Sequence, residues 1–135
     1  MSRYCLDTSA YSNFKRGDLR VVNLLDSADW LGISSIVLGE LWTGFILGNR
    51  LEKNEAELRE FLDNPVVERL SIDPEVARLY GEIVVDLRRA ATPIPTNDIW
   101  IAAAAARAGA TVLTYDPHFG RISRVGSLVL PKPSV

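Results

Sequence analysis

Short apolar segments alternate with longer segments of helical periodicity along the chain, and this alternation limits the possible folds more than any other feature. Each apolar segment has the length of a strand, and turn or capping residues separate it from the next helical segment. Strands connected through helices form right-handed crossovers, which place the strands parallel in one sheet. We therefore expect an α/β fold with a mostly parallel sheet flanked by helices on both faces.

Five strands and five helices are predicted. The predicted strands are Arg3–Leu6, Trp30–Ser34, Val66–Leu70, Thr111–Tyr115 and Leu128–Leu130. The first predicted helix begins after its cap Asp18 and reaches Ala28, the second begins after Ser34 or Ser35 and reaches Leu47, and the third runs from Arg50 to Leu62. The fourth begins at Asp73 and continues through Leu87, and the fifth begins after Thr96 or Asn97 and reaches Arg107. Residues 7–9 are expected to end the first strand and to open a loop.

The length of 135 residues fits one domain spanning 1–135, and a hydrophobic fraction of 47% is enough for a packed core. The net charge of −2 argues against a module that coats nucleic acid through charge alone, because such proteins are basic. It is compatible with an enzyme that holds phosphate through bound metal ions, since the cations then supply the positive charge.

Cys5 is the only cysteine, so an internal disulfide is impossible, and its apolar neighbours favour a small buried core residue. The cysteine and histidine spacing typical of zinc sites does not occur. These features suit a cytoplasmic location. The N-terminus shows no signal-peptide pattern, and the longest apolar run, Ile99–Ala106, is too short to cross a membrane.

Four acidic residues occupy positions that a parallel sheet brings to one edge. Asp7 follows the first predicted strand and Asp116 follows the fourth. Glu40 lies about one and a half turns into the helix after the second strand. Asp98 opens the helix before the fourth strand. Apolar residues surround all four, which is unusual for surface carboxylates, so we expect them to converge.

Converging carboxylates repel one another, and some of them would then stay protonated at neutral pH. A divalent cation removes this conflict, and oxygen ligands favour Mg²⁺ or Mn²⁺ over Zn²⁺. Such a site suits phosphodiester hydrolysis, in which metal ions activate water and stabilise charge on the attacking and leaving oxygens. Each acid also has a structural interpretation, as a turn residue, a helix-dipole partner or an ion-pair partner of an arginine. The four positions together favour the metal site.

Four segments, in order along the chain, resemble the PIN domain of VapC-type toxins: YCLDTSA at 4–10, SSIVLGEL at 34–41, NDIWIAAA at 97–104 and LTYDPHF at 113–119. The resemblance covers nearly the whole chain. It implies a PIN-like fold with a five-stranded parallel sheet, and an RNA endonuclease that needs Mg²⁺ or Mn²⁺ and leaves 5′-phosphate and 3′-hydroxyl ends. It also implies an antitoxin partner. The acidic residues of the family match Asp7, Glu40, Asp98 and Asp116 here, which are the expected catalytic and metal-binding residues.

One position departs from the family pattern. Many relatives carry Asp or Asn two residues after the last acid, where this chain has His118. A loop or packing role is expected for His118. Altered binding of a second metal ion, and proton transfer near neutral pH, are the alternatives.

Several polar residues lie next to the acids. Their side chains can orient a carboxylate or hold a metal-bound water, and they are Thr8, Ser9, Asn97 and Thr114. The first three can equally be helix caps. Lys15 and Arg16 follow the first acidic loop, where they either contact substrate phosphates or are simply solvated.

The function expected from these features is that of an endoribonuclease with RNA as its substrate, acting as the toxin of a toxin–antitoxin pair. The alternative is a catalytically weak PIN-like module that binds RNA or a protein through the same groove. A phosphotransfer receiver fits less well, because no acid pair adjoins the first strand and no lysine follows a late strand.

The helix that carries Glu40 indicates a binding surface. Residues 38–47 are apolar on almost every side, although a helix in an open α/β fold normally buries one face. Gly39 and Gly44 cost helix stability, which suggests that something packs closely against them. Either the neighbouring charged helix covers Trp42 and the residues after it as core, or a segment of a cognate antitoxin lies there. A homodimer is expected to use part of the same surface.

Overall fold

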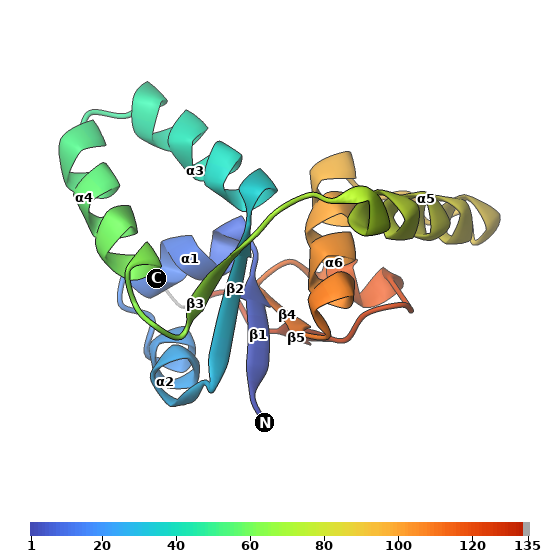
Figure 1. The fold of residues 1–135 in the computed structure, drawn as a ribbon, viewed down its shortest axis with the longest axis horizontal. Coiled ribbons are helices and arrows are strands. Elements are labelled where there is room, and N and C mark those ends of the chain that lie inside the picture. Colours follow the sequence, from blue (N-terminus) through green and yellow to red (C-terminus); the bar gives the residue numbers. More distant parts are fainter. Residues whose placement is uncertain (134–135) are drawn as a thin grey trace.

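The computed structural model describes residues 1–133, in which five strands form one parallel sheet in the order β3-β2-β1-β4-β5 (Figure 1). The strands are β1 (Arg3–Leu6), β2 (Trp30–Ser34), β3 (Val67–Leu70), β4 (Thr111–Thr114) and β5 (Ser127–Val129). The helices are α1 (Thr8–Lys15), α2 (Leu19–Ser27), α3 (Ser35–Leu47), α4 (Leu51–Leu62), α5 (Pro74–Arg89) and α6 (Thr96–Ala108), with a 3-10 helix η1 (Pro117–Arg121). The predicted fold class is confirmed.

The sheet lies between two layers of helices. Helices α1, α2 and α4 lie on one side of it, and α5 and α6 pack together on the other side (Figure 1). Helix α3 extends away from the carboxyl end of β2, and α4 returns toward the sheet. Strand β1 is central, with β2 and β4 as its neighbours, so the residues that follow these three strands share one edge of the sheet.

The core lies on the central strands, where Leu6, Ile33 and Leu113 are almost fully buried. In the layer formed by α5 and α6, the alanines at 102–105 of α6 are also buried, and their small side chains let this helix pack close to the strands. Cys5 is buried in the same core, as predicted.

Most predicted helix ends are confirmed. The side chains of Asp18, Ser34 and Asp73 accept hydrogen bonds from backbone N–H groups at the starts of α2, α3 and α5. Gly109 ends α6 with φ 65°, in the left-handed region that suits glycine. Among residues 1–133, no helix is both long enough and apolar enough to cross a membrane.

Two expectations were wrong. The loop expected after β1 is the helix α1, and the side chain of Asp7 caps it by accepting a hydrogen bond from the N–H of Ala10. The same residue types open turns and cap helices, so their presence alone does not separate the two. Thr96 and Asn97 are not the caps of α6, because both lie inside its first turn and Pro95 precedes them.

Candidate metal centre

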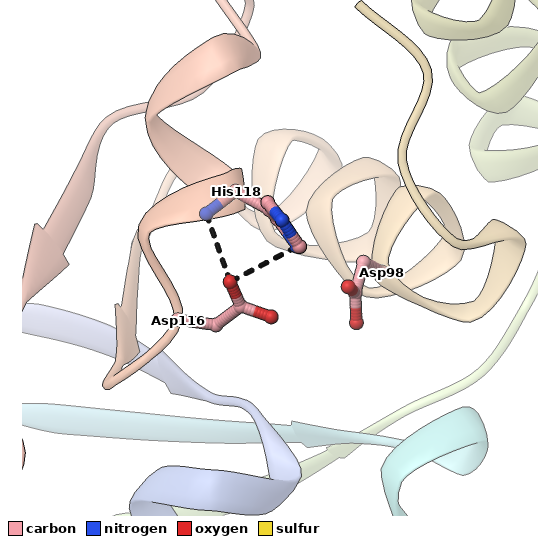
Figure 2. Close-up of side chains that lie close together, drawn as sticks. All are labelled: Asp98, Asp116 and His118. Carbon is pink, nitrogen blue, oxygen red and sulfur yellow. Dashed lines mark hydrogen bonds and ion pairs between the residues drawn. The ribbon is translucent and has the colours of Figure 1, made fainter.

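The four predicted acids lie at the carboxyl edge of the sheet, where β1, β2 and β4 end. Asp98 in the first turn of α6 and Asp116 after β4 approach each other, together with His118 of η1 (Figure 2). One ligand atom from each of these three residues lies within 4.8 Å of the other two. Asp7 and Glu40 are not part of this tight group of three.

Asp7 is held by a hydrogen-bond network that joins the start of α1 to the end of β4. Its Oδ1 accepts a hydrogen bond of 2.7 Å from the hydroxyl of Ser9, and its Oδ2 accepts one from the hydroxyl of Thr114. The Thr114 hydroxyl in turn accepts from the N–H of Asp116 at 2.9 Å, and that of Ser9 from the N–H of Tyr115 at 3.0 Å. Because Asp7 is 5% exposed, these bonds fix both carboxylate oxygens.

Glu40 is held between two other helices. Its Oε1 accepts a hydrogen bond of 2.6 Å from the hydroxyl of Thr8 in α1, and its Oε2 accepts one of 3.4 Å from the amide of Asn97 in α6. Two roles were possible for the polar residues next to the acids, orienting a carboxylate or capping a helix, and the hydrogen bonds distinguish between them. Thr8, Ser9 and Asn97 orient carboxylates, and none of them caps a helix.

His118 lies closer to the acids than a loop role requires. Its backbone N–H donates a 2.9 Å hydrogen bond to Oδ1 of Asp116, and its ring Nδ1 lies 3.2 Å from the same oxygen (Figure 2). Nδ1 is also shielded from solvent, and it has no hydrogen-bond partner among residues 1–133 because its contact with Asp116 lacks hydrogen-bond geometry. An unpartnered ring nitrogen beside two carboxylates fits the donor set of a divalent cation. In the sequence, the only sign of this arrangement is that His118 lies two residues after Asp116.

The electrostatics of the group also favour a cation. The pKa of Asp98 is raised to about 6, first by burial and then by the negative charges of Asp116, Asp7 and Glu40. Burial also raises the pKa of Asp7, against the opposing effect of the hydrogen bonds that it accepts. Without a cation, the folded protein therefore holds carboxylates that are costly to ionise.

The raised pKa of Asp98 leads to a prediction about the stability of the metal-free protein. Its pKa is about 6 in the folded state, whereas the ordinary pKa of an aspartate is 3.8, so ionisation lowers stability as the pH rises between these values. In excess chelator at pH 7, we expect Asp98→Asn to be more stable than the parent by about 1–2 kcal/mol, allowing for the partial exposure of the side chain.

The measurement is urea unfolding of both proteins between pH 4 and pH 8, limits set by the two pKa values. The advantage of Asp98→Asn should become small at the acid end, where Asp98 is protonated in the folded state and partly protonated in the unfolded state too. A parent protein more stable than the variant at neutral pH would contradict the account of electrostatic strain.

The two basic residues predicted near the site differ in their surroundings. Lys15 is the last residue of α1, and Arg16 is its C-cap at the start of the following turn. The amine of Lys15 lies 3.8 Å from a carboxylate oxygen of Glu57 in α4. Arg16 instead lines a groove together with Asp116.

Comparison with known proteins gives consistent results. Residues 4–125 match the PIN domain family. Ribonuclease VapC2 of Rickettsia felis is 31% identical over 131 residues, which cover 94% of this chain and 95% of that protein. Ribonuclease VapC4 of Mycobacterium tuberculosis is 33% identical over 97 residues, covering 72% and 74%. The solved structure of DNA-bound VapBC from Salmonella typhimurium matches with a TM-score of 0.80 and 30% identity, over 96% of this chain and 98% of that one.

Proposed function

Because the chain belongs to the PIN domain family, and within it to the VapC ribonucleases, we propose that it is a metal-dependent endoribonuclease that acts as the toxin of a toxin–antitoxin pair. The observation that carries the proposal is the tight group of Asp98, Asp116 and His118 at the carboxyl edge of the sheet. Asp7 and Glu40, each held by its own hydrogen bonds, flank this group. Parallel α/β sheets bind their ligands at this edge.

We propose that Asp7, Glu40, Asp98 and Asp116 are the catalytic metal-binding residues, with Mg²⁺ or Mn²⁺ as the ion. When bound, the ion activates a water molecule and neutralises charge on the phosphodiester. The nitrogen of His118 favours Mn²⁺, because Mg²⁺ keeps more strictly to oxygen ligands and octahedral geometry.

The polar residues around the acids orient the carboxylates of Asp7 and Glu40. Ser9 and Thr114 hold the two oxygens of Asp7, and Thr8 and Asn97 hold those of Glu40. Carboxylates that are fixed before substrate arrives lose little freedom on binding, which lowers the barrier to a reaction that depends on their geometry. Acting through the acids and not on the substrate, these four residues are positioning residues.

Helix α3 supplies the surface for the proposed protein partner. Helix α4 covers it only in part, since Trp42 is 37% exposed and Ile46 is 65% exposed. Within residues 1–133, and apart from the adjoining residues and the backbone of the helix itself, no atom lies within 4 Å of the position that a Cβ would take at Gly39 or Gly44. The fold of residues 1–133 therefore does not explain these glycines, whereas close approach of another chain would. We propose an antitoxin segment as the occupant, and a homodimer that shares part of this surface.

RNA as the substrate and the cytoplasm as the location belong to the same proposal. The decisive experiment incubates the purified protein, free of any partner, with total RNA in Mn²⁺, in Mg²⁺ and in chelator. We expect cleavage with either ion, with Mn²⁺ the more effective, and 5′-phosphate and 3′-hydroxyl ends on the products. Equal cleavage in chelator, or cyclic phosphate ends, would contradict metal-dependent hydrolysis.

A further inference from the structure

A groove of about 680 Å³ lies beside the metal centre. Asp116 and His118 form one part of its lining, and Arg16 at the end of α1 forms another. Lys132, in the segment that follows β5, forms a third. This last segment lies against α1, because Pro133 lines a smaller neighbouring pocket with Arg16 as well (Figure 1). Two basic side chains from distant parts of the sequence thus share one groove with the proposed metal ligand Asp116.

Both basic side chains are free to bind an anion. Within residues 1–133, neither Arg16 nor Lys132 forms an ion pair or a side-chain hydrogen bond, and both residues are exposed. Arg20, by contrast, is paired with Asp18 nearby. A cation without a partner attracts phosphate without first losing an internal ion pair.

A second basic groove gives a useful contrast. It measures about 430 Å³, lies between α1, α3 and α4, and is lined by Lys15, Arg50 and Lys53 and also by Arg16, which therefore borders both grooves. The amines of Lys15 and Lys53 lie 3.8 Å and 3.9 Å from carboxylate oxygens of Glu57, which partly neutralises them. None of the four proposed metal ligands lines this groove. Its charge is therefore balanced in part, and of its four basic residues only Arg16 also lines the groove beside the metal centre.

We propose that the RNA strand leaves the metal centre along the first groove, where Arg16 and Lys132 bind its phosphates next to the bond that is cut. This inference rests on the proposed ribonuclease function and adds the path of the substrate. The binding is electrostatic and directed at the backbone, so it is independent of base sequence. Lys132 thereby gives the segment after β5 a role in substrate binding.

The test measures binding of a short labelled single-stranded RNA of mixed sequence by fluorescence anisotropy. The background is full-length Asp98→Asn, in which cleavage is blocked, at several salt concentrations. We expect Arg16→Ala and Lys132→Ala each to weaken binding about fivefold. Each should also lower the slope of log affinity against log salt by about 0.7, the value for one lost phosphate contact on a single strand.

The matched control is Lys53→Ala, which removes one charge from the second groove. It should leave both the affinity and the salt slope nearly unchanged. Equal losses in Lys53→Ala and Lys132→Ala would overturn the inference, because binding would then follow net charge and not this groove. Unchanged binding in both Arg16→Ala and Lys132→Ala would also overturn it, while leaving the ribonuclease proposal intact. No RNA binding by the background protein while the parent still cleaves RNA would overturn the inference alone, and no RNA cleavage by the parent would overturn both.

Discussion

Replacing Asp98 with Asn is expected to reduce metal-dependent RNA cleavage about 1000-fold or more while the protein stays folded. The change removes one negative charge from the tight group with Asp116 and His118, at nearly constant size. A metal ion bound by fewer carboxylates is held more weakly, and the loss of several kcal/mol of transition-state stabilisation corresponds to a loss of this size. Asp98 is the best choice of the four acids, because within the part of the chain that the structure describes its side chain caps no helix and accepts no hydrogen bond that would be lost.

The measurement is the initial rate of cleavage in Mn²⁺, with thermal unfolding recorded for the same samples. Asp26→Asn is the matched control, because it removes an exposed carboxylate from α2 and should cut RNA at the parent rate. Asp7→Asn should also lose cleavage. Its interpretation needs the unfolding data, since Asp7 caps α1 as well. Parental cleavage by both Asp98→Asn and Asp7→Asn would rule out the carboxylate–metal mechanism.

Introducing a charge on the exposed face of α3 is expected to weaken the antitoxin complex about 100-fold. The variants are Trp42→Asp and Ile46→Asp. A buried interface aromatic commonly contributes several kcal/mol, and a carboxylate forced into an apolar contact adds a desolvation cost. Ile46 is the safer of the two for the fold, because it is 65% exposed. Phe45 is avoided because it is half-buried and packs against the core.

This experiment starts with coexpression of the chain and the protein encoded by the neighbouring small open reading frame. If the two copurify, affinities are measured for the parent and each variant. Val85→Asp is the control, since Val85 is also an exposed apolar residue but lies on α5, in the other helix layer. Parental affinity in both α3 variants would place the partner elsewhere, and a protein that binds no partner would remove the hypothesis.

The strands and their parallel direction could be predicted from the sequence, because the strands are short, apolar and separated by capped helices. The helix α1 could not, for a physical reason. It has eight residues, only Ala10 and Tyr11 of which are buried, and so it shows no long apolar stripe. Its position is set by packing against β1 and β4, which depends on residues far away in the sequence.

For the candidate site, too, the general position could be predicted from the sequence, but the detailed arrangement could not. Parallel strands bring Asp7 and Asp116 to one edge, and the helices that start or end at this edge bring Glu40 and Asp98 there too, so this much follows from a parallel α/β topology. The tight grouping of Asp98 and Asp116 with His118 does not, because it depends on the side-chain directions in α6 and η1. The groove residue Lys132 lies outside any motif, and only the course of the chain after β5 shows where it is.

The pairing of β1 with β4 has a consequence for the synthesis of this protein. The hydrogen bond from Thr114 to Asp7 joins residues that are 107 positions apart. A chain leaves the ribosome from its N-terminus, so Asp7 has no Thr114 to accept from until more than a hundred further residues have been translated. Asp98 and Asp116 arrive equally late. The nascent chain therefore lacks the complete proposed metal centre until Asp116 has been translated and has left the ribosome, so the messenger RNA and the ribosome that produce the protein are not exposed to a finished centre before that point.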